Sequence, residues 1–480
     1  MSGRALRLDD RSLRLLIVGT GLCWSVAFPV IALFHRLELY GDGAMFSYAV
    51  AVRDVWAFHW HNISGRTSVF LLTLLPAEAL VGITDKPWLG IIAYGLLFYV
   101  SPLLGLAGTY AADRSPGRII FVYACGSTAL LCPLIFGFPT EMWLAHAIFW
   151  PALALSHYAK PTRAGALLVF AAWLLLAFTH EGALLLLLAI VATLAPRGFG
   201  SAAFVRAAVS LMIILMLAVA AKIGLPPDDY YADAFLRAAL HFFDLEIFKV
   251  GVVLVLLGAI VTYGAILLTL SIWLPRGACI CALAIVLGLL SIYWLHFDHS
   301  VHASSRYYLR TALVIAMPLL GGIAAITAMT REGIVLDRLG RLRHAPTSPR
   351  GGTLCALGAI FLMVTLIHAV ETGKFVASWV EYRDAIGVLA MSSKSDPSLG
   401  DPRFVSAERI PPALAPLSWF STIPYLSIIL SNFAPNRLVI DPTGNYFWLS
   451  CRTATRSKEA ELVVPVQTRE LVRVYSCLHR

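Results

Sequence analysis

Residues 37–66 read LELYGDGAMFSYAVAVRDVWAFHWHNISGR and form the first long polar and aromatic segment of an otherwise apolar chain. The segment directly follows the apolar run 15–34, which is long enough to cross the roughly 30 Å hydrocarbon core of a bilayer. It carries Asp42 between two glycines and ends at Arg66 in a cluster of polar side chains. A polar loop in this position is the first place where we expect chemistry.

The composition of the whole chain predicts an α-helical polytopic membrane protein. Of its 480 residues, 59% are hydrophobic and only 14% are charged, whereas soluble domains are about half apolar and about a quarter charged. Many apolar runs approach or exceed the length of a membrane span. The net charge of +9 does not indicate a nucleic-acid partner, because the positive residues cluster in short loops between apolar runs.

The basic residues predict which side of the membrane each loop faces. If the apolar runs alternate, Arg114, Lys160, Arg197, Arg276 and the basic loop 331–350 fall on one side with the N-terminus, and this side is cytoplasmic by the positive-inside rule. Alternation requires an odd number of crossings within 68–111. We interpret 87–111 as the crossing and 68–82 as a re-entrant or tilted piece. The prediction is about eleven transmembrane helices and an external C-terminus.

The same reading divides the chain into two domains. Residues 1–370 form the transmembrane domain, with an external loop at 35–67, and residues 371–480 form a small external α/β domain. Within the tail, the apolar stretch 417–430 is short and contains Pro424, so we expect a buried or interfacial helix and not a span. Cys451 and Cys477 also lie in the tail and would be able to pair in an oxidising compartment.

The first external loop offers a candidate catalytic carboxylate and a helix. Met45, Val52, Trp56 and His59 recur at helical spacing, which predicts an amphipathic helix lying along the membrane surface. Asp42 precedes this helix and has two compatible interpretations. It is a general base for an incoming hydroxyl group, or it is the N-cap of the helix.

Three further ionisable residues lie at helix ends on the same side as Asp42. They are Glu141, His180 and Glu181. Ionisable residues at such positions commonly line a polar cavity, and the alternative is that they are solvated loop residues at the interface. His180 and Glu181 are the better candidates, because almost no loop surrounds them between two long apolar runs.

The loop 296–310 is rich in polar donors. Its histidines, among them His302, and Asp298 are side chains that bind divalent metals, so a divalent metal is one interpretation. Arg306 and Arg310 are four residues apart and therefore share one helical face at the membrane boundary. Two guanidinium groups there would hold a phosphate or pyrophosphate head group. The alternative is that these arginines snorkel at a helix end.

This layout resembles the GT-C superfamily of integral-membrane glycosyltransferases, which use polyprenyl-phosphate sugars. The resemblance rests on the cytoplasmic N-terminus, on Asp42 and the helix after it in the first external loop, and on the pair Gly65 and Arg66 leading into the second membrane segment. The span number and the external C-terminal domain also agree. Many members have paired acidic residues in the first loop, whereas here Asp42 stands alone with Asp54 a helix away, which leaves metal dependence open.

The resemblance implies an inverting glycosyltransferase in a bacterial inner membrane, with its C-terminus in the periplasm. One sugar would pass from a polyprenyl-phosphate donor to an envelope glycan or lipid acceptor on the external face. Asp42 would be the base, and Arg306 and Arg310 would hold the leaving lipid phosphate. The implied substrate-binding residues are Arg66, Glu141, His180, Glu181, His302, Arg306 and Arg310. No cofactor is expected, apart from the divalent metal left open above.

Two other functions remain as alternatives. A multispan transporter or flippase for a lipid-linked or anionic substrate would have internal repeats and broken helices at the membrane midplane, but the sequence has no convincing repeat and its polar groups gather on one face. An O-antigen-type polymerase would have a large external loop between late spans, whereas here the large external piece is the tail.

Overall fold

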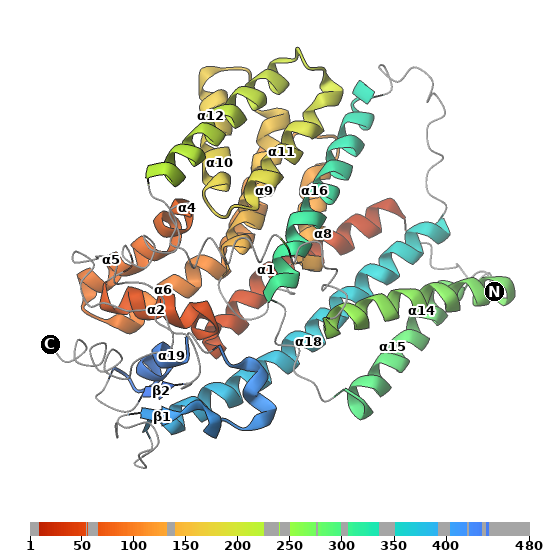
Figure 1. Ribbon diagram of the computed structural model, residues 1–480. Coiled ribbons are helices and arrows are strands. Elements are labelled where there is room, and N and C mark those ends of the chain that lie inside the picture. The colour runs from red at the N-terminus through yellow and green to blue at the C-terminus, as the bar shows by residue number, and fades with distance from the viewer. Residues whose placement is uncertain are drawn as a thin grey trace.

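The computed structural model describes residues 9–53, 55, 66–131, 140–224, 240, 250–274, 277–298, 306–335, 351–391, 404–419, 422–433 and 438–440 (Figure 1). Nearly all of this is helix. Seven helices in the described part are long and apolar enough to cross a membrane. They are α1 (Asp10–His35), the continuous helix Thr67–Thr84, α12 (Ala202–Gly224), α14 (Gly251–Trp273), α15 (Ala278–His296), α16 (Arg306–Arg331) and α18 (Gly351–Met391).

An eighth span is added if a bent helix pair counts as one. Helices α6 (Pro87–Tyr99) and α7 (Ser101–Ala112) meet at an angle of 41°. The helix Thr67–Thr84 comprises α4 (Thr67–Val69), a π-helical turn η2 (Phe70–Leu74) and α5 (Leu75–Thr84). The remaining helices of the bundle are α8 (Ile119–Leu131), α9 (Glu141–Tyr158), α10 (Arg163–Ala177) and α11 (Ala183–Leu194). The helical polytopic class therefore agrees with the structure, and the count of eleven spans stays a prediction.

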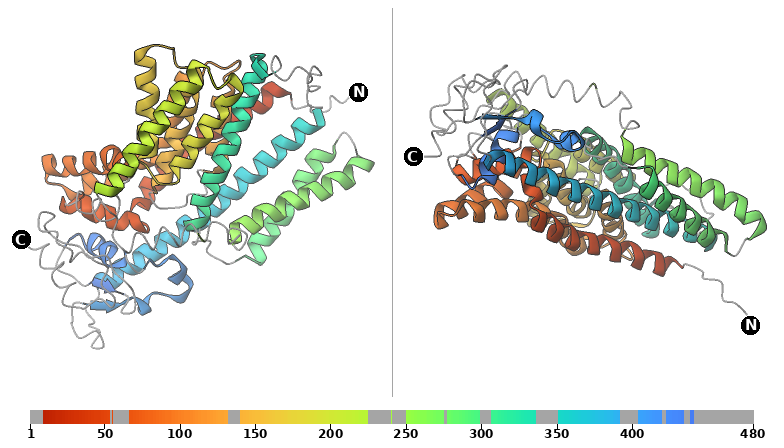
Figure 2. Two further views of the ribbon diagram at one scale, coloured as in Figure 1. Left: turned by 45° about the horizontal axis from the view of Figure 1, so that its top comes forward. Right: turned by 90° about the horizontal axis from the view of Figure 1, so that it is seen from below.

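Glycines allow the central helices to approach very closely. A Cβ atom on Gly21 of α1 would collide with the carbonyl oxygen of Cys125 in α8, and one on Gly105 of α7 would collide with the carbonyl oxygen of Ala147 in α9. Such backbone contacts at small residues are typical of helix packing in membranes, where close van der Waals packing drives association. Figure 2 shows the resulting bundle from two further directions.

The helix after the first span differs from the sequence prediction. It is α2 (Asp42–Val52), and every residue from Gly43 to Ala51 is buried. Even the polar Ser47 is 0% exposed, and it donates to the backbone oxygen of Glu38. The predicted interfacial helix with one apolar face is therefore wrong for α2. Small residues on the other faces let neighbouring helices pack on all sides, and His59 lies outside the described residues.

The C-terminal part packs against the end of α1. Helix α18 runs 41 residues without a break through residue 370, where the sequence predicts a domain boundary. The indole of Trp379 in α18 donates to the His35 carbonyl at 2.9 Å, and its ring lies 5.3 Å from that of Tyr40, centroid to centroid. Helix α18 therefore fixes the exit of the chain from the first span.

The described remainder of the tail is small. Strands β1 (Phe404–Ser406) and β2 (Leu438–Ile440) form a parallel pair. Two 3-10 helices, η7 (Ala407–Arg409) and η8 (Pro412–Leu417), precede the short helix α19 (Ile423–Leu430). Because α19 is buried from Ile423 to Ile429, the prediction of a short buried helix in 417–430 is confirmed. Cys451 and Cys477 lie outside the described residues.

Candidate functional site

Arg66 joins two carboxylates that are far from it in the sequence. Its Nη1 donates to Glu141 Oε1 at 2.5 Å, and its Nη2 donates to Glu181 Oε2 at 3.4 Å. Arg66 is only 9% exposed and Glu141 only 6%. Buried charges of this kind persist only when they are paired, and the planar fork of arginine is suited to binding two carboxylates.

Helix ends position the three partners. Arg66 lies immediately before α4, Glu141 is the first residue of α9, and Glu181 lies in the turn before α11. A carboxylate at a helix N-terminus is stabilised by the partial positive charge of the unpaired backbone N–H groups. The structure thus brings together Arg66, Glu141 and Glu181, which the sequence placed on one side of the membrane without pairing them.

His180 lies in the same turn and its proton can be assigned. The backbone N–H of Gly182 donates to His180 Nδ1 at 3.0 Å, so Nδ1 is an acceptor and the neutral ring carries its proton on Nε2. His180 Nδ1 also lies 3.9 Å from Glu181 Oε2. His180 therefore belongs to the Arg66 cluster, as an imidazole that offers an Nε2–H group.

Helix α16 approaches this turn. A Cβ atom on Gly182 would lie 3.0 Å from Val314 Cγ2 of α16. Arg306 and Arg310 lie in the first turns of α16, ahead of Val314 in the sequence. The backbone therefore places both arginines in the part of α16 that leads to the cluster. Their side chains, and His302, lie outside the described residues.

Tyr94 relates Asp42 to the Arg66 cluster, because charges of both act on its hydroxyl. The hydroxyl of Tyr94, which is fully buried in α6, interacts electrostatically with the carboxylates of Glu141, Asp42 and Glu38. The N-cap of α2 is Gly41, with φ 58° and ψ −133°, and Asp42 is the first helical residue. The interpretation of Asp42 as the N-cap is therefore wrong. Asp42 is partly exposed, and the general-base interpretation stays a hypothesis.

Glu38 is a site residue that the sequence reasoning missed. It is 0% exposed in η1 (Leu37–Leu39), and Arg36 Nη1 donates to its Oε1 at 3.2 Å. Its Oε2 has no hydrogen-bond partner among the described residues. Burial raises the pKa of Glu38 to about 7, although the nearby Arg36 charge lowers it in part. The feature of the sequence that could have indicated Glu38 is its position between Leu37 and Leu39, directly after a predicted span.

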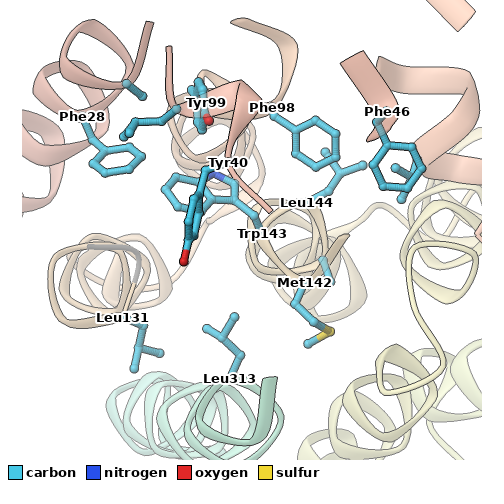
Figure 3. Close-up of a cluster of buried hydrophobic side chains, with 14 of the residues drawn as sticks. Phe28, Tyr40, Phe46, Phe98, Tyr99, Leu131, Met142, Trp143, Leu144 and Leu313 are labelled. Atoms are coloured by element: carbon cyan, nitrogen blue, oxygen red, sulfur yellow. The ribbon is translucent and has the colours of Figure 1, made fainter. Parts of the chain in front are cut away.

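Other buried polar atoms lie around the first loop and the start of α9. Within the described ranges, the Tyr94 and Tyr99 hydroxyls, Thr140 Oγ1 and Trp143 Nε1 have no hydrogen-bond partner. Figure 3 shows Tyr99 and Trp143 in an otherwise largely apolar cluster, with ring centroids 6.3 Å apart. A buried unpaired polar group costs about 1–3 kcal/mol, so these atoms are suited to bind water or the hydroxyl groups of a ligand.

The predicted metal loop is only partly described. Asp298 is 6% exposed, and its Oδ2 forms an ion pair with Lys374 Nζ at 2.7 Å. This pair ties the end of α15 to α18 and occupies the carboxylate that we considered as a metal ligand. The described residues contain no group of three or more His, Cys, Asp or Glu side chains that could hold a metal ion. His302 lies outside them.

Comparison of the chain with protein-family models finds no match, and comparison with curated proteins finds none either. The GT-C resemblance therefore stays a prediction from the layout of the sequence.

Proposed function

We propose that this protein is a membrane glycosyltransferase. It moves a sugar from a polyprenyl-phosphate donor to a glycan or lipid acceptor of the cell envelope, with inversion at the anomeric carbon. The observation that supports this proposal best is the convergence of Arg66, Glu141, Glu181 and His180 at the starts of α4, α9 and α11. Tyr94 is within electrostatic range of both Glu141 and Asp42. Ionisable groups at such a position are functional candidates because they are costly to bury.

Asp42 would act as the general base. Its carboxylate takes the proton of the acceptor hydroxyl while that oxygen attacks the anomeric carbon, and the bond to the lipid phosphate breaks with its electron pair on the phosphate. Negative charge grows on the leaving phosphate, so donors and cations aimed at it speed the reaction. In this proposal His180 Nε2–H, Arg306 and Arg310 supply them.

Arg66 has a different part in this scheme from the phosphate-binding arginines. Its guanidinium is already opposed by Glu141 and Glu181, so its charge is not available to a substrate phosphate. We assign it as a positioning residue that holds the Glu181 turn, and with it His180, against the start of α9. The two carboxylates then shape the polar wall of the sugar site.

The test is glycan analysis of the cell envelope in a strain that lacks the protein. Wild type and Asp42→Asn are returned separately, and Asp85→Asn is the matched control because Asp85 is an exposed carboxylate in the turn between α5 and α6. We expect wild type and Asp85→Asn to restore the missing sugar and Asp42→Asn to fail at equal membrane levels. Restoration by Asp42→Asn would remove it as the base.

A multispan transporter or flippase is the second candidate. The bend of 41° between α6 and α7 supports it, because broken helices form the substrate sites of many transporters. Purified protein in liposomes separates the two functions. A transferase consumes a lipid-linked sugar and yields a glycosylated acceptor, whereas a flippase moves the lipid-linked sugar between leaflets without changing it.

A further inference from the structure

An open basic pocket lies at the end of the bundle where α1 begins. Its volume is about 980 Å³. The start of α1, the turn 113–118 between α7 and α8, and the end of α16 form it together. Its arginines are Arg11, Arg14, Arg114, Arg118 and Arg331.

The two acidic residues of the pocket neutralise only one of these five arginines. Asp10 pairs with Arg14, whose Nε lies 2.9 Å from Asp10 Oδ2. Asp113 is buried, and its oxygens accept the backbone N–H groups of Ser115 and Phe121 at 2.8 and 2.9 Å. Asp113 thus holds the turn and the start of α8 in place, and it forms no ion pair within the described part of the chain.

Three arginines carry uncompensated charge into the pocket. Arg11, Arg114 and Arg331 are exposed and make no ion pair with any residue that the structure describes. Arg118 differs, since its guanidinium donates to the Tyr110 carbonyl and stacks on the Tyr110 ring, with Cζ 3.7 Å from the ring centroid. Like charges that the fold gathers in one place repel each other, and a bound anion relieves that repulsion.

Gly117 shows how closely two of the guanidinium groups converge. It has φ +72°, and a Cβ atom on it would lie 2.7 Å from Arg14 Nη1 and 3.8 Å from Arg331 Nη1. Arg14 comes from the first helix and Arg331 from the end of α16, so tertiary packing alone brings them to this point. Two guanidinium groups at one position are suited to the several oxygens of a phosphate.

The rest of the pocket is apolar and extends along two helices. Leu15 and Val18 of α1 line it together with Phe121 and Val122 of α8. A free phosphate ion makes no favourable contact with apolar side chains. A phospholipid uses both parts, because its phosphate contacts the arginines at the membrane surface while an acyl chain lies along α1 and α8.

We propose that this pocket binds the phosphate head group of an anionic phospholipid. The site is separate from Glu38 and Asp42, because α1 spans 26 residues, or about 39 Å at 1.5 Å per residue, and both residues follow its opposite end. A bound lipid would fasten α1, the 113–118 turn and α16 to one another. It would therefore stabilise the bundle without entering the proposed reaction.

The test is lipid binding by the full chain in detergent, measured by native mass spectrometry and by thermal unfolding. The probes are phosphatidylglycerol, phosphatidylcholine with the same acyl chains, and inorganic phosphate. The variants are Arg114→Gln and Arg331→Gln. Arg163→Gln is the control, since Arg163 is an exposed arginine at the start of α10, outside the pocket.

We expect phosphatidylglycerol to bind more tightly than phosphatidylcholine and to raise the unfolding temperature. Each pocket variant should weaken phosphatidylglycerol binding about fivefold, which corresponds to about 1 kcal/mol per basic residue near an anionic surface, and the control should not. Equal binding of both lipids, or equal loss in the control, would overturn the proposal. Displacement of the lipid by millimolar phosphate would overturn the lipid assignment.

Discussion

Replacement of Arg66 by Met tests the charge cluster most directly. The change removes the guanidinium that pairs with Glu141 and Glu181, and it keeps a long apolar side chain in the same space. Glu141 is 6% exposed, so solvent cannot compensate its charge. We expect the variant to be strongly destabilised and to recover when the carboxylate is neutralised as well.

The size of the effect follows from the burial of the pair. Removal of one partner from a buried ion pair leaves the other charge uncompensated and costs about 3–5 kcal/mol. Arg66→Met should therefore lose about 3 kcal/mol or more of unfolding free energy. Because Glu141 is neutral after Glu141→Gln, the double variant Arg66→Met with Glu141→Gln should be less destabilised than the sum of the two single variants.

The assay is a double-mutant cycle on unfolding in detergent micelles, with the expression level and helix content of each variant checked first. Coupling between Arg66 and Glu141 should exceed about 1 kcal/mol, whereas independent sites add to within about 0.5 kcal/mol. Additive costs, or a loss below about 1 kcal/mol for Arg66→Met, would refute the reasoning. The matched control is Arg163→Met on the exposed start of α10, which should change little.

The remaining predictions concern protonation and helix packing. The pKa of Glu38 rises from 4.5 to about 7 on folding, so its protonated form stabilises the fold and that stability is lost as the pH rises from about 4.5 through 7. Glu38→Gln should remove this dependence of stability on pH and raise the unfolding free energy at pH 8 by up to about 3 kcal/mol. Thermal unfolding between pH 5 and 8 measures both effects. An unchanged pH dependence in the variant would contradict the raised pKa of Glu38. Gly21→Ala should destabilise the bundle by about 1–3 kcal/mol, because its Cβ atom would collide with the Cys125 carbonyl. Gly19→Ala in the same helix is the control, because a Cβ atom at Gly19 has no neighbour within 4 Å, and this change should be neutral or stabilising. Equal unfolding temperatures for the two variants would show that α1 and α8 do not pack so closely.

The helical membrane class could be predicted from the sequence. A span must satisfy its backbone hydrogen bonds internally and present apolar side chains to lipid, so its signal lies in a local run of apolar residues. The same local information predicted α19 as a short buried helix. It also placed Glu141, His180 and Glu181 at helix ends, because each interrupts or borders an apolar run.

The structure alone decided which of these charges meet. Arg66 lies 75 residues from Glu141 and 115 from Glu181, and no local pattern in the sequence relates residues so far apart. Helix α2 was misread for a related reason. Spacing predicts which residues share a helical face, but burial of the other faces depends on the elements that pack there, here α5, α6 and α19.

Glu38 and the basic pocket illustrate the same division. The sequence by itself determined that a glutamate follows the first span and that arginines cluster between spans, because residue type and spacing are local properties. Only tertiary packing decided that Glu38 loses solvent and that Arg14 and Arg331 converge over Gly117. Burial and electrostatic interaction depend on distances through space, and folding sets those distances.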